Sequence, residues 1–330
     1  MNRVEVWRGG VVESVHEVSV AAVDAAGRLR ARAGDPARIA FARSAVKPVQ
    51  AMPVVEDGVA ARFAFDDREL ALCCASHSGE PNHVSAAESM LRKIGVEEDA
   101  LACGPHAPFH STSARALIQA GTLPRRVHNN CSGKHAGMLA LCRFHDWPVE
   151  GYHTAGHPAQ QRMLAEIGRW AEVDEETVAT AVDGCGVVTF ALALEGMAFA
   201  FAKLGAACRR GENGPTRLLG AMAAYPEYVG GTGRLCTELA RAVQGRIIAK
   251  TGAEGVYCAT VPGAELGIAL KVEDGATRAS EPALIHVLSE LGVLSADERE
   301  SLAQFAEPGV KNTRGEVVGR ITPRIELHAE

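Results

Sequence analysis

Alternating apolar and polar side chains near the start of the chain predict β-strands. The alternation covers Val4–Trp7 and Val11–Val23, and the turn residues 24–27 lead into a further alternating stretch at 28–32. A period of two residues is typical of a strand that buries one face. We therefore expect the chain to begin with a small antiparallel unit.

A helical pattern dominates the middle of the chain, from Pro48 to about Gly245. There, apolar residues recur at spacings of three and four, as they do on one face of an amphipathic helix. Proline is tolerated in the first turn of a helix, so Pro158 favours a helix start at that point. The expected helices cover residues 49–55, 83–94, 113–119, 136–144, 158–171 and 233–243.

The longest apolar run, Val187–Leu204, is interrupted by Glu195, Gly196 and Lys203. A membrane-spanning helix needs about 20 mostly apolar residues. The run alternates more like a pair of strands, so we expect no membrane span.

Strand patterns return after Gly245 and are followed by two last helices. The strands are expected at 246–250, 255–260 and 266–272, and the helices at 283–291 and 296–305. Strands at both ends around a helical middle predict an α/β chain of the α+β kind. One antiparallel sheet would then be formed from both chain ends, with a mainly helical subdomain inserted.

This organisation corresponds to a single domain, residues 1–330. Its sheet portion with terminal helices is expected at 1–43 and 246–330, and its mainly helical portion at 44–245. An apolar content of 47% is enough for a substantial core.

The charge and the cysteine content limit the cellular compartment and the classes of binding partner that we expect. A net charge of -6, with acidic and basic residues mixed along the chain, argues against a nucleic-acid partner. Charged residues within the first eight positions do not fit a secretory signal, so we expect a cytoplasmic protein. In that compartment the nine cysteines would be reduced thiols, available for packing, metal binding or chemistry.

Two short motifs carry the candidate chemistry. Ser44 and Lys47 are three residues apart, which places a hydroxyl and an amine on one face of a helix. A chain of this length contains roughly one such pair by chance, and a capping serine beside a solvated lysine is the plain alternative. Lys250-Thr251-Gly252 follows an apolar run and resembles the edge-strand motif of serine β-lactamases and penicillin-binding proteins. The two motifs together predict a serine hydrolase with a lysine base.

Further blocks sharpen this resemblance. They are Arg43–Pro48, Ala75–Ser78, Asn129–His135, Asp183–Gly186 and Lys250–Gly255. Taken together, they resemble the rhizobial-type, thermolabile L-asparaginase family. The resemblance implies a serine β-lactamase-like fold, related also to that of glutaminases, and hydrolysis of L-asparagine to L-aspartate and ammonia.

The resemblance also implies two Ser-Lys tandems, Ser44 with Lys47 and Ser76 with Lys250. An ordinary lysine, with a pKa of about 10.4, is protonated at pH 7 and cannot act as a base. Burial together with a second nearby ammonium disfavours the charged form, which gives a physical reason for two lysines in one pocket. We expect Ser44 to attack and Ser76 to assist proton transfer or orient the substrate, with Ser78 as an alternative for either role.

Two cysteines form a candidate metal site. Cys131 and Lys134 are three residues apart, and Cys185 lies in a glycine-rich turn. From the residues alone, packed thiols and a zinc site completed by His128 or His135 both stay open. The resemblance instead implies zinc held by Cys131, Lys134 and Cys185, with water as the fourth ligand, in a substrate-positioning role.

The remaining expectations concern substrate and assembly. Arg43 is a candidate for the α-carboxylate, Asp183 for the α-ammonium or a metal-bound water, and His135 for the pocket wall. Cys236 resembles a family cysteine near the site, although a buried thiol is the simpler interpretation. The family suggests a homodimer. Two rival functions are a penicillin-recognising serine hydrolase and a non-catalytic protein that binds zinc or an amino acid.

Overall fold

The computed structural model describes all 330 residues. They form two compact units. Unit 1 contains residues 1–45, 192–206 and 238–330, and unit 2 contains residues 46–191 and 207–237. Each unit is therefore built from segments that are far apart in the sequence.

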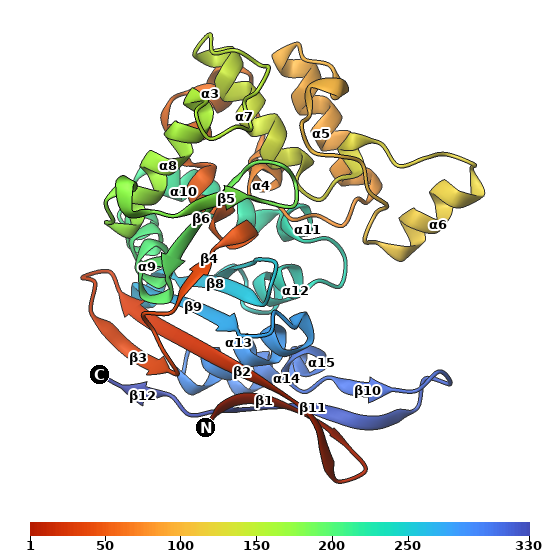
Figure 1. Ribbon diagram of the computed structural model, residues 1–330, viewed down its shortest axis with the longest axis vertical. Coiled ribbons are helices and arrows are strands. Elements are labelled where there is room, and N and C mark those ends of the chain that lie inside the picture. The colour runs from red at the N-terminus through yellow and green to blue at the C-terminus, as the bar shows by residue number, and fades with distance from the viewer. The chain divides into compact units, whose positions relative to one another are not determined.

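Unit 1 is built on a nine-stranded antiparallel sheet, in which seven strands have the order β10-β11-β1-β2-β9-β8-β7. The other two strands are β3, which pairs with β2, and β12, which pairs with β3. In Figure 1 the red N-terminal strands run beside the blue C-terminal ones. The predicted sheet from both chain ends is thus confirmed. Its strands are β1 (Asn2–Arg8), β2 (Val11–Asp24), β3 (Leu29–Ala33), β7 (Ile248–Thr251), β8 (Val256–Val261), β9 (Leu266–Val272), β10 (Gly309–Lys311), β11 (Val317–Ile325) and β12 (His328–Ala329); a further short strand is β4 (Ile39–Phe41).

The core of unit 1 is formed where helices cover the sheet. Every residue of β8 is buried, and α13 (Thr277–Glu290) packs against β9 and β11. Gly267 of β9 approaches the helix that begins at Leu194 so closely that a Cβ there would lie 1.9 Å from the carbonyl oxygen of Ala198. Only glycine fits this contact, which holds helix and sheet together. Two shorter helices, α14 (Ala296–Ser301) and α15 (Ala303–Ala306), follow α13.

Two expectations about secondary structure are wrong. The run Val187–Leu204 is not a pair of strands, because β6 (Val188–Ala193) passes directly into the helix α9 (Leu194–Arg209). Between Glu195 and Lys203 the second half of the run is continuously apolar or small, so the period of a helix and that of a strand cannot be told apart there. The chain also does not end in helices, since β10, β11 and β12 follow them.

Unit 2 is mainly helical, and α7 (Ser132–Phe144) lies at its centre. Every residue of α7 from 132 to 142 is buried, and the helix packs against α2, α3, α4, α5 and α8. No helix in the structure is long and apolar enough to cross a membrane. The other helices of this unit are α1 (Lys47–Gln50), α2 (Met52–Glu56), α3 (Val59–Arg62), α4 (Asp67–Cys73), α5 (Pro81–Ile94), α6 (Ser111–Gln119), α8 (Pro158–Ala171), α10 (Asn213–Ala224) and α11 (Pro226–Val229), and β5 (Thr180–Val182) pairs with β6. The helix α12 (Leu235–Ala242) begins in unit 2 and continues into unit 1.

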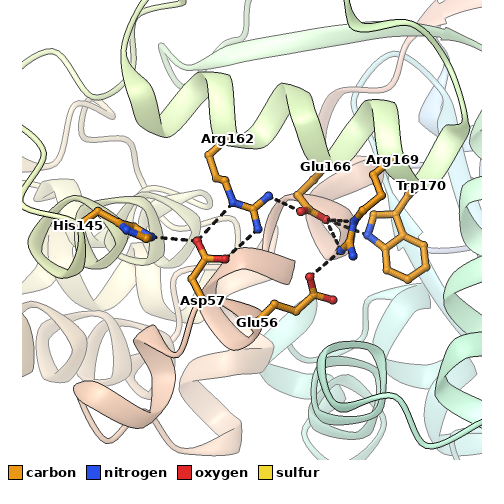
Figure 2. Close-up of polar contacts among 7 residues, drawn as sticks. All are labelled: Glu56, Asp57, His145, Arg162, Glu166, Arg169 and Trp170. Carbon is orange, nitrogen blue, oxygen red and sulfur yellow. Dashed lines mark hydrogen bonds and ion pairs between the residues drawn. The ribbon is translucent and has the colours of Figure 1, made fainter.

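An ion-pair network links α8 to α2 and α7 (Figure 2). Asp57, just after α2, accepts hydrogen bonds from Arg162 at 2.8 Å and from His145 at 3.0 Å. Arg162 also contacts Glu166, whose buried carboxylate accepts a hydrogen bond from the Trp170 indole at 2.9 Å. A charge removed from water needs such partners, and here they come from α8 and from the residues that directly follow α2 and α7.

Candidate active site

Lys47, at the start of α1, is fully buried, and its amine connects three segments of unit 2. The Nζ atom donates to the Ala75 carbonyl oxygen at 2.5 Å, to Ser76 Oγ at 3.1 Å and to Cys131 Sγ at 3.0 Å. Pro48 occupies the first turn of α1, as the sequence predicted, where it costs no hydrogen bond. The amine of Lys47 is thus held against a serine hydroxyl in a water-poor environment.

Backbone hydrogen bonds fix the loop that carries Ser76. The Ser76 amide donates to the Val229 carbonyl at 3.0 Å, and the His77 amide donates to the Asn130 carbonyl at 3.1 Å. His77 Nδ1 accepts from the Gly79 amide at 3.1 Å, so its Nε2–H donates to Ser132 Oγ at 2.9 Å. Burial lowers the pKa of His77 well below its ordinary value, which keeps the ring neutral.

Ser78 has a different environment from Ser76. Its hydroxyl donates to the Gly230 carbonyl at 2.8 Å. Gly231, with a φ of +106°, lies so close that a Cβ there would be 2.6 Å from Ser78 Oγ. In this loop Ser76 is therefore the serine in contact with a lysine amine, and Ser78 holds a turn.

Cys131, Lys134 and Cys185 come together in unit 2. Lys134 Nζ donates to Cys185 Sγ at 3.3 Å, and the Cys131 thiol is hydrogen-bonded to Cys185. The bond from Cys131 and the charge of Lys134 outweigh burial and lower the pKa of Cys185 to about 4. The same bond and burial raise the pKa of Cys131 to about 12. Burial disfavours the charged form of Lys134, but the two sulfurs and Asp183 outweigh burial, so the pKa of Lys134 is raised. The cluster therefore favours a negative charge on the Cys185 sulfur and a positive charge on the Lys134 amine.

The donor atoms of this cluster fit a zinc ion. Cysteine sulfur is a ligand that zinc prefers, a lysine amine is a rarer nitrogen ligand, and all three side chains are buried. Binding would release the protons now on Cys131 and Lys134. No group of three histidine, cysteine or acidic side chains in the structure could hold a metal, so the amine of Lys134 would have to take part.

His135 lies next to this cluster on α7 and is fully buried. Burial, followed by the nearby charge of Lys134, lowers its pKa to about 3, so its ring is neutral. Its Nδ1 lies 2.5 Å from the hydroxyl of Tyr152, whereas its Nε2 has no hydrogen-bond partner. Asp183 is half-buried in the turn before Cys185, where its carboxylate accepts from the Gly184 amide at 2.7 Å.

In unit 1, Ser44 lies in the 3₁₀ helix η1 (Arg43–Val46), directly before α1. Arg43 has a φ of +50°, a left-handed conformation that is costly for a residue other than glycine and that often marks functional sites. Gly252 of the Lys250-Thr251-Gly252 motif packs against this segment. A Cβ there would lie 3.0 Å from the Ala42 carbonyl oxygen and 3.3 Å from the Ala45 nitrogen. The glycine thus allows β7 to approach the backbone on both sides of Ser44.

Lys250 is fully buried on β7, which forms one edge of the sheet. Its amine donates to the Thr251 carbonyl at 2.6 Å, and the residue pairs with Cys258 on β8. The expected edge-strand position of the motif is confirmed. Cys236, on α12, is buried.

The structure therefore assembles the sequence-predicted residues in two groups. Unit 2 brings Lys47, Ser76 and His135 to the Cys131 cluster, and unit 1 brings the Ser44 segment to β7. The pairings of Ser44 with Lys47 and of Ser76 with Lys250 stay predictions. Sequence reasoning missed Tyr152, which belongs to no motif, as well as the buried Cys103. Burial is the main cause that raises the pKa of Cys103 to about 12.

Comparison with known protein families gives a match that covers almost the entire chain. The family description for L-asparaginase II matches residues 4–323. The chain belongs to the L-asparaginase II family. A comparison of the chain with curated proteins found no match. Membership makes the chain an amidohydrolase of L-asparagine and confirms the family and the activity expected from the motifs.

Proposed function

We propose that this L-asparaginase cleaves the side-chain amide of asparagine through a covalent Ser-Lys mechanism. The observation that carries the proposal is the buried Lys47 amine in hydrogen-bond contact with Ser76. A serine hydroxyl is a weak nucleophile until a base takes its proton, and a buried amine is a base of the required kind. Ser44 and Lys250 enter the proposal through their motifs and through the packing of Gly252 against the Ser44 segment.

The first half of the reaction forms an ester. Ser44 Oγ attacks the amide carbon of the substrate, and Lys47 accepts the hydroxyl proton. Lys47 then returns this proton to the departing nitrogen, so that ammonia leaves and an aspartyl ester remains on Ser44. Backbone N–H groups at the start of the Ser44 helix are the donors proposed for the oxyanion.

The second half releases aspartate. Water attacks the ester carbon, a lysine amine takes a proton from this water, and the same proton passes to Ser44 Oγ as aspartic acid leaves. Ser76 and Lys250 are proposed to carry this proton traffic. The 3.1 Å bond from Lys47 to Ser76 supports the assignment, because it joins members of the two predicted tandems.

Three further residues are proposed to bind the amino-acid part of the substrate. Arg43 would receive the α-carboxylate and Asp183 the α-ammonium, since opposite charges and directed hydrogen bonds fix a zwitterion. His135 would form part of the pocket wall through its unpartnered Nε2.

Cys131, Lys134 and Cys185 are proposed to hold zinc. A bound zinc ion would supply a fixed positive charge that orients the substrate. The buried sulfur and amine donors described above support this proposal. The residues of the Ser-Lys pairs perform the proton transfers.

The wider context is also proposed. We infer a serine β-lactamase-like fold in which residues 1–330 act as one catalytic domain, and a homodimer in the cytoplasm. The edge-strand position of Lys250 supports the fold, and the nine free cysteines support a reducing compartment.

One assay tests the mechanism against its rivals. Purified protein is given asparagine, glutamine and a chromogenic β-lactam, and ammonia release and β-lactam opening are followed. Ammonia from asparagine is expected, and Lys47→Met should reduce its rate by at least about a hundredfold, the usual contribution of a general base. Lys311→Met, at an exposed position on β10, is the matched control and should be fully active.

Each rival predicts another outcome. Opening of the β-lactam without ammonia release would favour a penicillin-recognising hydrolase. Binding of asparagine without any product would favour a non-catalytic binding protein. A fully active Lys47→Met enzyme would contradict the proposed base.

A further inference from the structure

Tyr152 is a fully buried tyrosine for which the reaction proposed above has no role. It lies 1% exposed in the loop between α7 and α8, and its hydroxyl has two neighbours. The Ala102 backbone amide donates to this oxygen at 2.9 Å, and His135 Nδ1 lies 2.5 Å from it. Both contacts are formed within unit 2.

The direction of the second hydrogen bond follows from counting donors and acceptors. The Tyr152 oxygen already accepts from Ala102, and its own proton has one acceptor within reach, His135 Nδ1. A buried hydroxyl that leaves its proton unpaired costs free energy. Tyr152 therefore donates to Nδ1, and the single proton of the neutral imidazole must be on Nε2.

This tautomer gives His135 a buried N–H group with no acceptor in the protein. Unpaired buried donors are rare, because each loses its bond to water without replacement. His135 also belongs to the segment that carries the site, since it directly follows Lys134 on α7 and its backbone amide donates to the Cys131 carbonyl at 3.0 Å. An acceptor on a ligand would satisfy the Nε2–H group.

We propose that Tyr152 is a positioning residue that fixes His135 as an Nε2–H donor to a carbonyl or carboxylate oxygen of the substrate. Tyr152 acts only through His135 and does not touch the substrate. Gln160 supports the arrangement, because its side-chain amide donates to the Tyr152 carbonyl at 2.9 Å and holds the backbone of this loop. The inference rests on the proposed active site.

The variant Tyr152→Phe removes the hydroxyl and leaves the ring. His135 then loses the partner that selects its tautomer, so part of the population carries its proton on Nδ1. The Michaelis constant for asparagine should rise about two- to tenfold, the value of one hydrogen bond, with little change in kcat. Tyr225→Phe is the matched control, because the Tyr225 hydroxyl has no hydrogen bond in the protein.

A double-mutant cycle separates positioning from general damage. In His135→Gln the side-chain amide can donate without help from Tyr152, so Tyr152→Phe added to it should change the Michaelis constant less than about twofold. An equal loss in both backgrounds would mean that Tyr152 acts by packing alone and would overturn the proposal.

Nitrogen NMR of the His135 ring gives a test that does not depend on turnover. The wild-type protein should show Nδ1 unprotonated and Nε2 protonated, and Tyr152→Phe should show a mixture. Protonated Nδ1 in the wild type would overturn the inference even in an active enzyme. The expected tautomer in a protein that releases no ammonia would instead contradict the proposed function and leave the Tyr152 contact established.

Discussion

Gly133, between Cys131 and Lys134 on α7, has no room for a side chain. A Cβ at this position would lie 2.4 Å from the Leu72 carbonyl oxygen and 2.5 Å from Leu72 Cγ. Both distances are about 1 Å inside the optimal contact of about 3.5 Å. Because one obstacle is the backbone of α4, no rotamer change removes the clash. The substitution Gly133→Ala must therefore move α7 away from α4.

The cost can be compared with two matched substitutions. Overpacking costs about 3 kcal/mol when the backbone has to shift, and the better helix propensity of alanine returns about 1 kcal/mol, so Gly133→Ala should lose about 2 kcal/mol. One turn later, a Cβ at Gly137 would meet the flexible end of Cys73 at 3.1 Å, and we expect a change near zero. On α10, Gly220 has nothing within 4 Å of its Cβ position, and alanine there should stabilise by up to about 1 kcal/mol.

Urea unfolding of the three variants, followed by circular dichroism, measures this order. Gly133→Ala should also raise the Michaelis constant for asparagine, because the shift displaces Cys131 and Lys134, which are proposed to hold the substrate-orienting zinc. A Gly133→Ala variant as stable as Gly137→Ala would refute the close contact between α7 and α4.

Three further predictions concern the ion-pair network and the proposed metal site. Burial raises the pKa of Asp57, but hydrogen bonds from Arg162 and His145 outweigh it and leave the pKa below its ordinary value. The stabilisation by Asp57 is therefore present above a pH of about 4 and is lost as the pH falls through the folded-state pKa. Asp57→Asn should lower the free energy of urea unfolding by about 1.5–3 kcal/mol at pH 7 and by less in acid. A loss of stability that does not change with pH would contradict the proposed role of the ionised carboxylate. Burial raises the pKa of the neighbouring Glu56, so Glu56→Gln should not destabilise at pH 7. Elemental analysis should find about one zinc per chain, lost in Cys131→Ser, and full metal in that variant would remove the site.

Periodicity predicted those elements that bury a regular face. The predicted bounds of α8 (158–171) and β9 (266–272) agree with the structure, because both segments carry an unbroken pattern. Strand β11 was missed, although it pairs with β1 along its length. Pro323 and Gly319 interrupt its alternation, and its pairing partner is at the other end of the chain, where no local pattern reports it.

The candidate site residues likewise divide into those that a local sequence pattern indicates and those that only the folded chain reveals. Short motifs made Lys47, Ser76 and Lys250 candidates for the site, because the proposed chemistry depends on spacing along the chain or on a strand position, and their roles stay predictions. Tyr152 carried no such signal, since its role depends on Ala102 and His135, which only the folded chain brings to its hydroxyl.

The central claim is that asparagine is hydrolysed through an ester on Ser44. Enzyme turning over asparagine is quenched in acid, digested and analysed by peptide mass spectrometry, with Ser44→Ala and Ser76→Ala beside the wild type. The account predicts an aspartyl group on the peptide that contains Ser44, still detectable in Ser76→Ala and lost in Ser44→Ala together with turnover. An aspartyl group on Ser76, or normal ammonia release from Ser44→Ala, would contradict it.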